Sequence, residues 1–95
     1  MKHGAVFDWD TLSITFDSGR RVRLDITEAN ILRCLWMRES CISMKDLARH
    51  AISHSSRAGT AGVYVMRLRK VLGEGAIETI VGRGYILRMK LRIVP

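Results

Sequence analysis

The segment from Thr60 to Leu72 constrains this chain more than any other, because it predicts one helix with two unlike sides. At about 100° per residue, one side is an apolar line of the kind that packs on a core, formed by Ala61, Val65, Leu68 and Leu72. The opposite side is a mixture of small polar, aliphatic and basic residues, namely Thr60, Val63, Met66, Arg67 and Lys70, with Tyr64 and Arg69 on its flanks. No acidic residue interrupts the segment. Such a helix suits the major groove of DNA, and an ordinary solvated surface helix is the competing interpretation.

The chain is strongly basic, which bears on its partner. Its 95 residues include 16 Lys and Arg against 9 Asp and Glu, a formal net charge of +7. This excess favours a polyanionic partner, nucleic acid before a membrane surface. Hydrophobic residues make up 47% of the chain, which excludes a disordered basic tail. The length suits a single compact domain over residues 1–95.

The sequence contains no predicted membrane span or secretion signal. No apolar run approaches the roughly 18 residues that a span requires. Asp8 and Asp10 stand where a signal peptide needs an apolar stretch. Cys34 and Cys41 are expected to be free packing thiols, as is usual in a reducing compartment. We therefore expect a cytoplasmic protein without a membrane partner.

The segment 4–26 predicts a small antiparallel sheet of three or four strands. A short apolar run at 5–7 is followed by alternating apolar and polar residues at 12–16 and again at 22–25. This period of two is typical of half-buried strands. Turn-forming residues at 17–20 separate the last two runs. The expected role of the sheet is to give the helices a surface to pack on.

The first predicted helix begins at Thr27 and Glu28, where a hydroxyl can cap free N–H groups and a carboxylate favours the first turn. It extends to about Glu39, and the short connection at 40–42 predicts a single strand bridge. The apolar residues at helical spacing are expected in the core, namely Ile31, Leu32, Leu35 and Trp36.

The second predicted helix begins at Met44, because Ser43 and Asp46 have the spacing of a capping box, and it extends to about Ile52. Residues 54–59 have the composition of a loop, and Gly73 ends the basic helix that follows. Two helices joined by a short loop, the second one basic, form a helix-turn-helix arrangement. The buried side of the second helix is expected to consist of Leu47, Ala48, Ala51 and Ile52.

The C-terminal segment predicts a β-hairpin. Residues 77–81 are β-branched and apolar, Gly82-Arg83-Gly84 is a tight turn, and residues 85–91 alternate again. Arg83 would then lie at the tip of a hairpin beside a basic helix, where it could reach the DNA backbone or minor groove. The predicted fold class is α+β, a winged helix-turn-helix with an N-terminal antiparallel sheet, three helices and a C-terminal hairpin.

Catalytic and metal sites find little support in the sequence. His50, His54 and Cys41 are the only grouped candidate ligands, and without a C-x-x-C pair they do not match structural zinc spacing. We find no carboxylate pair, Ser/His/Asp set or phosphate-binding glycine loop. We therefore expect a non-enzyme with no cofactor, no metal and no small-molecule substrate.

Two segments at a fixed spacing carry a family resemblance. The sequence V-Y-V-M-R-L-R-K-V-L at 63–72 is followed, after five residues, by E-T-I-V-G-R-G-Y-I-L at 78–87. Together they closely resemble the OmpR/PhoB-type winged-helix domain, the DNA-binding output module of bacterial two-component response regulators. The segment 24–28, L-D-I-T-E, is similar to a further element of that family. The resemblance covers essentially the whole chain.

The resemblance implies particular contacts with double-stranded DNA. It places Val63 and Arg67 against bases in the major groove. We expect Lys70 at the backbone because it lies on the basic side of the helix, and Arg83 there or in the minor groove because it lies at the wing tip. The residues expected at the DNA backbone are Thr60, Tyr64, Arg69, Lys70, Thr79, Arg83 and Tyr85.

This chain also departs from the family pattern. Family members usually carry an arginine where this chain has Val81, a basic residue where it has Met66, an acid where it has Gly62 and an arginine where it has Gly59. These losses keep an alternative function open, a protein-binding adaptor that contacts RNA polymerase or another regulator, with DNA contact secondary. Non-specific nucleoid binding is a third hypothesis.

The function predicted from these features is sequence-specific DNA binding for transcriptional regulation, with the helix at 60–72 in the major groove and the wing at 82–84 beside it. The resemblance implies head-to-tail pairs on direct repeats and contact with RNA polymerase. The loop at 54–59 looks short for that second role and lacks an aromatic residue. No receiver domain is expected within the chain, so it is either an effector domain cut from a longer regulator or a freestanding one.

Overall fold

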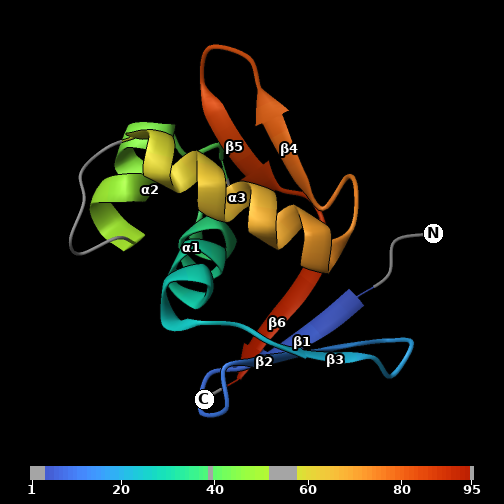
Figure 1. Cartoon of the computed structure of the whole chain (residues 1–95). Coiled ribbons are helices and arrows are strands. Elements are labelled where there is room, and N and C mark those ends of the chain that lie inside the picture. The colour runs from blue at the N-terminus through green and yellow to red at the C-terminus, as the bar shows by residue number, and fades with distance from the viewer. Residues whose placement is uncertain (1–3, 39, 52–57, 95) are drawn as a thin grey trace.

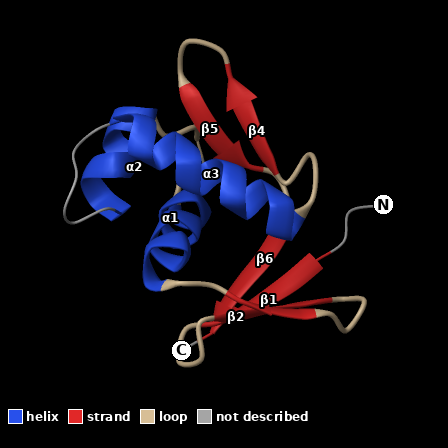
Figure 2. Ribbon diagram, viewed as in Figure 1, coloured by secondary structure: helices blue, strands red, loops and turns tan. Residues whose placement is uncertain are grey.

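The computed structural model describes residues 4–38, 40–51 and 58–94, without the side chains of residues 51 and 58–60. The described residues form three helices, a four-stranded sheet and a separate two-stranded hairpin. Figure 1 and Figure 2 show the helices between the sheet and the hairpin. This is the predicted α+β winged-helix architecture. The elements in chain order are β1 (Gly4–Asp8), β2 (Ser13–Phe16), β3 (Arg21–Arg23), α1 (Ile26–Met37), α2 (Met44–Ala51), α3 (Ala58–Leu72), β4 (Ile77–Ile80), β5 (Gly84–Leu87) and β6 (Lys90–Val94).

The larger sheet combines the two ends of the described chain. Its strand order is β3-β2-β1-β6, with β1, β2 and β3 antiparallel as predicted. Ala5 and Phe7 of β1 are buried while Val6 between them is exposed, so the predicted apolar run at 5–7 forms a strand with one buried face. The fourth strand, β6, runs parallel to β1, from the pair Gly4 and Lys90 to the pair Asp8 and Val94.

The prediction of one continuous strand from Tyr85 to Leu91 is therefore wrong. The hairpin strand β5 ends at Leu87, and the backbone N–H of Arg88 donates to the carbonyl of Ala76 at 2.7 Å. From Lys90 on, the chain pairs with β1 instead of β4. Apolar alternation continues through both strands, so the sequence pattern does not reveal that the pairing partner changes.

The capping of α1 also differs from the prediction. Asp25, rather than Thr27, is the N-cap, and the helix begins at Ile26. The Asp25 carboxylate accepts from the backbone N–H of Glu28 at 2.7 Å, and the Glu28 carboxylate accepts from the backbone N–H of Asp25 at 2.9 Å. This reciprocal pair is a capping box, which a carboxylate at the N-cap forms as well as a hydroxyl does. The helix ends at Met37, and Glu39 lies outside the described residues.

The predicted bridge after α1 is confirmed. Ile42 and Tyr85 exchange two backbone hydrogen bonds, of 2.8 and 2.9 Å, and this joins the connection between α1 and α2 to the hairpin. The bridge brings Gly84 so close that an added Cβ would lie 2.0 Å from the Ile42 carbonyl oxygen. The φ angle of Gly84 is also +144°, which L-residues rarely adopt. Only glycine therefore fits at this position of the wing.

The second helix agrees with the prediction where it is described. The Ser43 hydroxyl accepts from the backbone N–H of Asp46 at 3.1 Å, so Ser43 caps α2 as expected. Leu47 and Ala48 are buried. The side chains of Ala51 and Ile52, which were expected to be buried, lie outside the described residues, and so does the expected loop at 54–57. Because α3 already begins at Ala58, the prediction that the loop extends to Gly59 is wrong.

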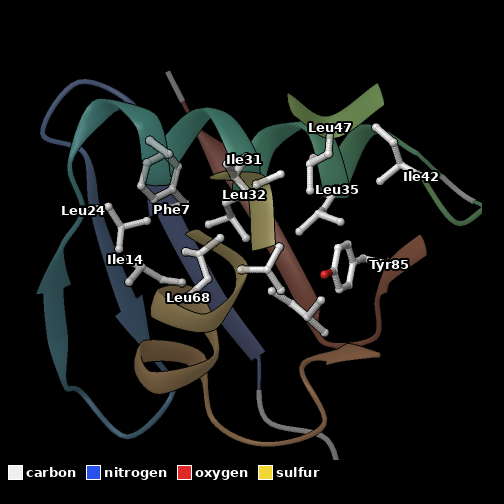
Figure 3. Packing of buried hydrophobic residues seen from close by; sticks show 14 of the residues in the cluster. Phe7, Ile14, Leu24, Ile31, Leu32, Leu35, Ile42, Leu47, Leu68 and Tyr85 are labelled. Atoms are coloured by element: carbon white, nitrogen blue, oxygen red, sulfur yellow. The ribbon is translucent and has the colours of Figure 1, made fainter. Parts of the chain in front are cut away.

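One core joins all the layers, as Figure 3 shows. Leu68 of α3 lies among side chains of α1 and of the larger sheet, and Tyr85 lies at the hairpin end of the same cluster. Trp36 was expected in this core, and that prediction is wrong because 42% of the residue is exposed. The largest fully buried side chains are those of Phe7, Ile14, Ile31, Leu32, Leu35, Ile42, Leu47, Val65 and Leu68.

No helix in the described part of the chain is long and apolar enough to cross a membrane.

The burial of α3 leads to a stability prediction. Leu68→Ala should destabilise the domain by about 2–5 kcal/mol, because it removes buried contacts and leaves a cavity. That is a large share of the roughly 5–15 kcal/mol that stabilises a typical domain, so the Tm should fall markedly. Lys70 is exposed on the same helix, and Lys70→Ala should change stability by no more than about 0.5 kcal/mol. Thermal unfolding of both variants by circular dichroism checks this. An early melt of Lys70→Ala beside a normal melt of Leu68→Ala would mean that α3 is rotated from the orientation described.

Candidate nucleic-acid interface

Helix α3 is fixed along one side and at its end. Ala61, Val65 and Leu68 are buried, as the apolar line in the sequence predicts, while Leu72 is half-buried. Gly73 adopts a φ angle of +96°, and its N–H donates to the Arg69 carbonyl at 2.9 Å. This left-handed glycine ends the helix where the sequence predicted. The sides of α3 that are not buried therefore have a fixed orientation relative to the core.

The side of α3 that faces away from the core is open to solvent. Val63 and Met66 are 49% and 58% exposed, and Arg67 and Lys70 are exposed beside them. We call these four residues the α3 front. The Arg67 guanidinium lies over the ring of Tyr64, 5.1 Å from its centroid, a distance at which cation–π attraction restrains the side chain. The α3 front thus combines two apolar side chains with two cations and contains no carboxylate.

Arg69, Thr79 and Tyr85, three of the predicted backbone contacts, lie together at the joint between α3 and the hairpin. The Arg69 guanidinium donates to the Thr79 hydroxyl at 2.6 Å and to the Ile77 carbonyl at 3.0 Å. It also lies over the Tyr85 ring, 5.6 Å from the centroid. These contacts tie α3 to β4, so Arg69 has a structural role that the sequence did not reveal.

The other predicted contacts differ in accessibility. Tyr85 is only 6% exposed, so little of its surface is offered to any ligand in this structure. Arg83 is exposed in the turn between β4 and β5, and its N–H donates to the Ile80 carbonyl at 2.9 Å. Val81 beside it is 93% exposed. Thr60 lies within α3, but its side chain is outside the described residues.

Arg20 also positions α3, and the sequence patterns did not predict this role. The Arg20 guanidinium donates to the Val71 carbonyl at 2.7 Å and lies over the Phe16 ring, 4.5 Å from the centroid. A cation at the last carbonyl groups of a helix satisfies free acceptors and interacts favourably with the helix dipole. No local pattern marks this contact, because it joins the turn before β3 to the end of α3.

Metal and thiol chemistry have little basis in the described part of the chain. No group of three or more His, Cys, Asp and Glu side chains is placed there so that it could hold a metal ion. Cys34 and Cys41 are both half-buried free thiols. Burial raises the pKa of the Cys34 thiol, and Arg33 and Arg38 offset this only in part, so the thiol is protonated at neutral pH.

Comparison with known proteins identifies the fold. No protein-family model matches the sequence, and no curated protein sequence matches it. The structure does match solved DNA-binding domains of OmpR/PhoB-type regulators. At this level of sequence identity the likeness establishes the fold of the chain.

Three of these structures illustrate the match. The DNA-binding domain of CadC from E. coli is 20% identical, with a TM-score of 0.74 over 84% of this chain and 81% of that one. The DNA-binding domain of the response regulator AdeR, solved in complex with an intercistronic region, is 23% identical, with a TM-score of 0.74 over 87% of this chain and 92% of that one. The C-terminal domain of the nisin resistance regulator NsrR is 28% identical, with a TM-score of 0.67 over 81% of this chain and 84% of that one.

The contacts of Arg69 lead to a prediction that separates its structural role from any role at a ligand. Arg69→Ala should destabilise the domain by about 1–3 kcal/mol, because it removes charge-assisted hydrogen bonds to Ile77 and Thr79. The matched control is Arg67→Ala on the α3 front, since Arg67 makes no hydrogen bond to another described residue. Its Tm should remain within about 2 °C of the wild-type value, as for other exposed substitutions. Equal Tm values for the two variants would contradict the structural role of Arg69.

Proposed function

We propose that this chain binds double-stranded DNA in a sequence-specific manner and acts in transcriptional regulation. In this proposal α3 enters the major groove, where Val63 and Arg67 meet base edges. The hairpin tip with Arg83 lies on the backbone or in the adjacent minor groove. Tyr64, Arg69, Lys70, Thr79, Tyr85 and Thr60 are assigned to the backbone.

The α3 front is the observation that carries this proposal. It is the exposed side of a helix whose other side is fixed in the core, and its only charged residues are Arg67 and Lys70. An arginine guanidinium can bond to O6 and N7 of guanine together, and aliphatic side chains can contact the thymine methyl group. The net charge of +7 supplies the long-range attraction to a polyanion.

Further assignments follow by analogy with the matched fold. AdeR, whose domain is similar, was solved with DNA, which supports a DNA partner for this chain as well. From the family resemblance we propose a cytoplasmic regulator in which residues 1–95 form one DNA-binding domain. It would bind as head-to-tail pairs on direct repeats and contact RNA polymerase.

The dependence of binding on salt provides the first test. Each phosphate that the protein neutralises releases counterions, at a slope of about −0.9 in log K against log [salt] per contact. With only some of the proposed backbone contacts cationic, the slope should be roughly −2 to −5 per monomer. Fluorescence anisotropy on a duplex selected from a random pool, titrated at several salt concentrations, measures it. Failure to bind any duplex at low salt, or affinity independent of salt, would remove the proposed function.

A second test separates the helix from the wing. Arg67→Ala should weaken binding to the selected duplex by about 1–3 kcal/mol and relax the preference at one base pair, because a base contact is lost. Arg83→Ala should weaken binding to selected and random duplexes by similar factors, because a tip residue meets backbone. Competition titrations with both duplexes distinguish the two patterns. If Arg67→Ala reduced both affinities equally, Arg67 would be a backbone contact and not a base-reading residue.

A further inference from the structure

An apolar hollow of about 390 Å³ lies along α1, at a site that the proposed function does not use. Met37 is 66% exposed at its edge, and Trp36 is exposed next to it. Soluble monomers rarely leave large apolar side chains gathered in a concave place without a binding role. We call this hollow the α1 groove, and its lining consists of Trp9, Arg33, Trp36, Met37, Ile93 and Val94.

The two indole rings of the α1 groove are held in place. The Trp36 Nε1–H donates to the Leu91 carbonyl at 2.7 Å, which ties α1 to β6. The Trp9 ring meets Phe7 edge-on, with centroids 5.7 Å apart, and the Arg33 guanidinium lies over its face at 5.0 Å. Side chains that are already ordered lose little entropy when a ligand binds. The α1 groove is therefore preorganised and not a loose apolar surface.

Among the described residues, the charged side chain that lines the α1 groove is a cation, Arg33. A second hollow, of about 370 Å³, shares Arg33 and Met37 with the α1 groove and adds Cys34, Arg38, Ile42 and His50 to its lining. Within the described residues, no carboxylate lines either hollow. The one ion pair among the described residues joins Arg88 to Glu78 on the hairpin, so neither Arg33 nor Arg38 is neutralised by a described acid.

The α1 groove and the α3 front lie on different sides of the molecule. Buried residues of α1, including Ile31, Leu32 and Leu35, share the core with Val65 and Leu68 of α3. The exposed side chains of each helix therefore point away from this shared core. A ligand on the α3 front leaves the α1 groove open.

We infer that the α1 groove is a docking site for an acidic, amphipathic segment of a second protein. Its apolar side chains would enter the groove between Trp9, Trp36 and Met37, and its carboxylates would meet Arg33 and Arg38. Helix-in-groove recognition of this type uses apolar anchors at i, i+3, i+4 and i+7. The inference stands independently of DNA binding by α3.

Other occupants fit the α1 groove less well. DNA presents a polar, regularly charged backbone, whereas five of the six lining residues are apolar. Free in solution, two copies of this chain repel each other because each carries a net charge of +7, whereas the pairs proposed above form on DNA, whose phosphates offset this charge. An acidic protein segment matches both the apolar lining and the cationic edge.

The chain provides its own reporter for this site. Its two tryptophans, Trp9 and Trp36, both line the α1 groove. Exclusion of water from their rings should shift the fluorescence emission to the blue. The probe is a synthetic helical peptide with leucines at i, i+3, i+4 and i+7 and glutamates at the other positions. We expect a saturable blue shift that weakens with added salt and that does not occur with the same peptide carrying lysines in place of the glutamates.

Two exposed methionines give matched variants. Met37→Glu places a carboxylate in the α1 groove and should weaken peptide binding by about tenfold or more. Met66→Glu makes the same change on the α3 front and should leave peptide binding unaltered. Conversely, duplex DNA binding should be lost in Met66→Glu and kept in Met37→Glu. Circular dichroism establishes that both variants are folded. Arg33→Gln, which removes the positive charge without adding a negative one, should weaken binding of the glutamate peptide.

Several results would overturn the inference. These are a blue shift of equal size with the lysine peptide, no shift with either peptide, and loss of the shift in Met66→Glu. A shift caused by duplex DNA would assign the α1 groove to nucleic acid. A shift that grows with protein concentration alone, with dimers in sedimentation, would assign it to a second copy. Failure of the wild-type chain to bind DNA, beside normal peptide binding, would remove only the function proposed for α3.

Discussion

The buried contact between α1 and α3 is the constraint on which the rest of the molecule depends. Ala61, Val65 and Leu68 leave no freedom for α3 to rotate, because each is almost entirely removed from solvent. The direction of Val63 and Arg67 is a geometric consequence of that burial and of the helical repeat. Arg20 at one end of the helix and Arg69 on its flank add polar restraints to the same orientation. The recognition proposed for α3 thus relies on its apolar residues as much as on its basic ones.

Features set by neighbouring residues could be predicted from the sequence. The two sides of α3, its end at Gly73 and the cap at Ser43 each depend on a few consecutive positions, so periodicity and turn chemistry reveal them. The bridge at Ile42 was expected from the shortness of the connection. The exposed positions Val63 and Arg67 followed from the same helical phase as the buried ones. The DNA contacts assigned to them remain a prediction.

Features set by distant residues could not be predicted. Nothing near Lys90 indicates that this strand pairs with β1, and nothing near Arg20 indicates the end of α3. Trp36 has the spacing of a core residue, but its ring lies at the edge of the core because the indole N–H finds a carbonyl on β6. An aromatic ring with a polar atom is stable half in and half out of solvent, so hydrophobicity alone misplaces it. The α1 groove exists because of that placement.

The parallel pairing of β1 with β6 has a consequence for the order of folding. The strands that pair come from opposite ends of the described sequence, so the larger sheet is complete only after everything between them has been synthesised. Pairing of such distant segments must overcome a loop-closure entropy, and helices that form between them would reduce it by bringing the two ends closer. A ribosome-bound chain that lacks β6 therefore exposes one edge of β1 to other strands. Pairing of β6 with β1 closes that edge and removes a site for aggregation.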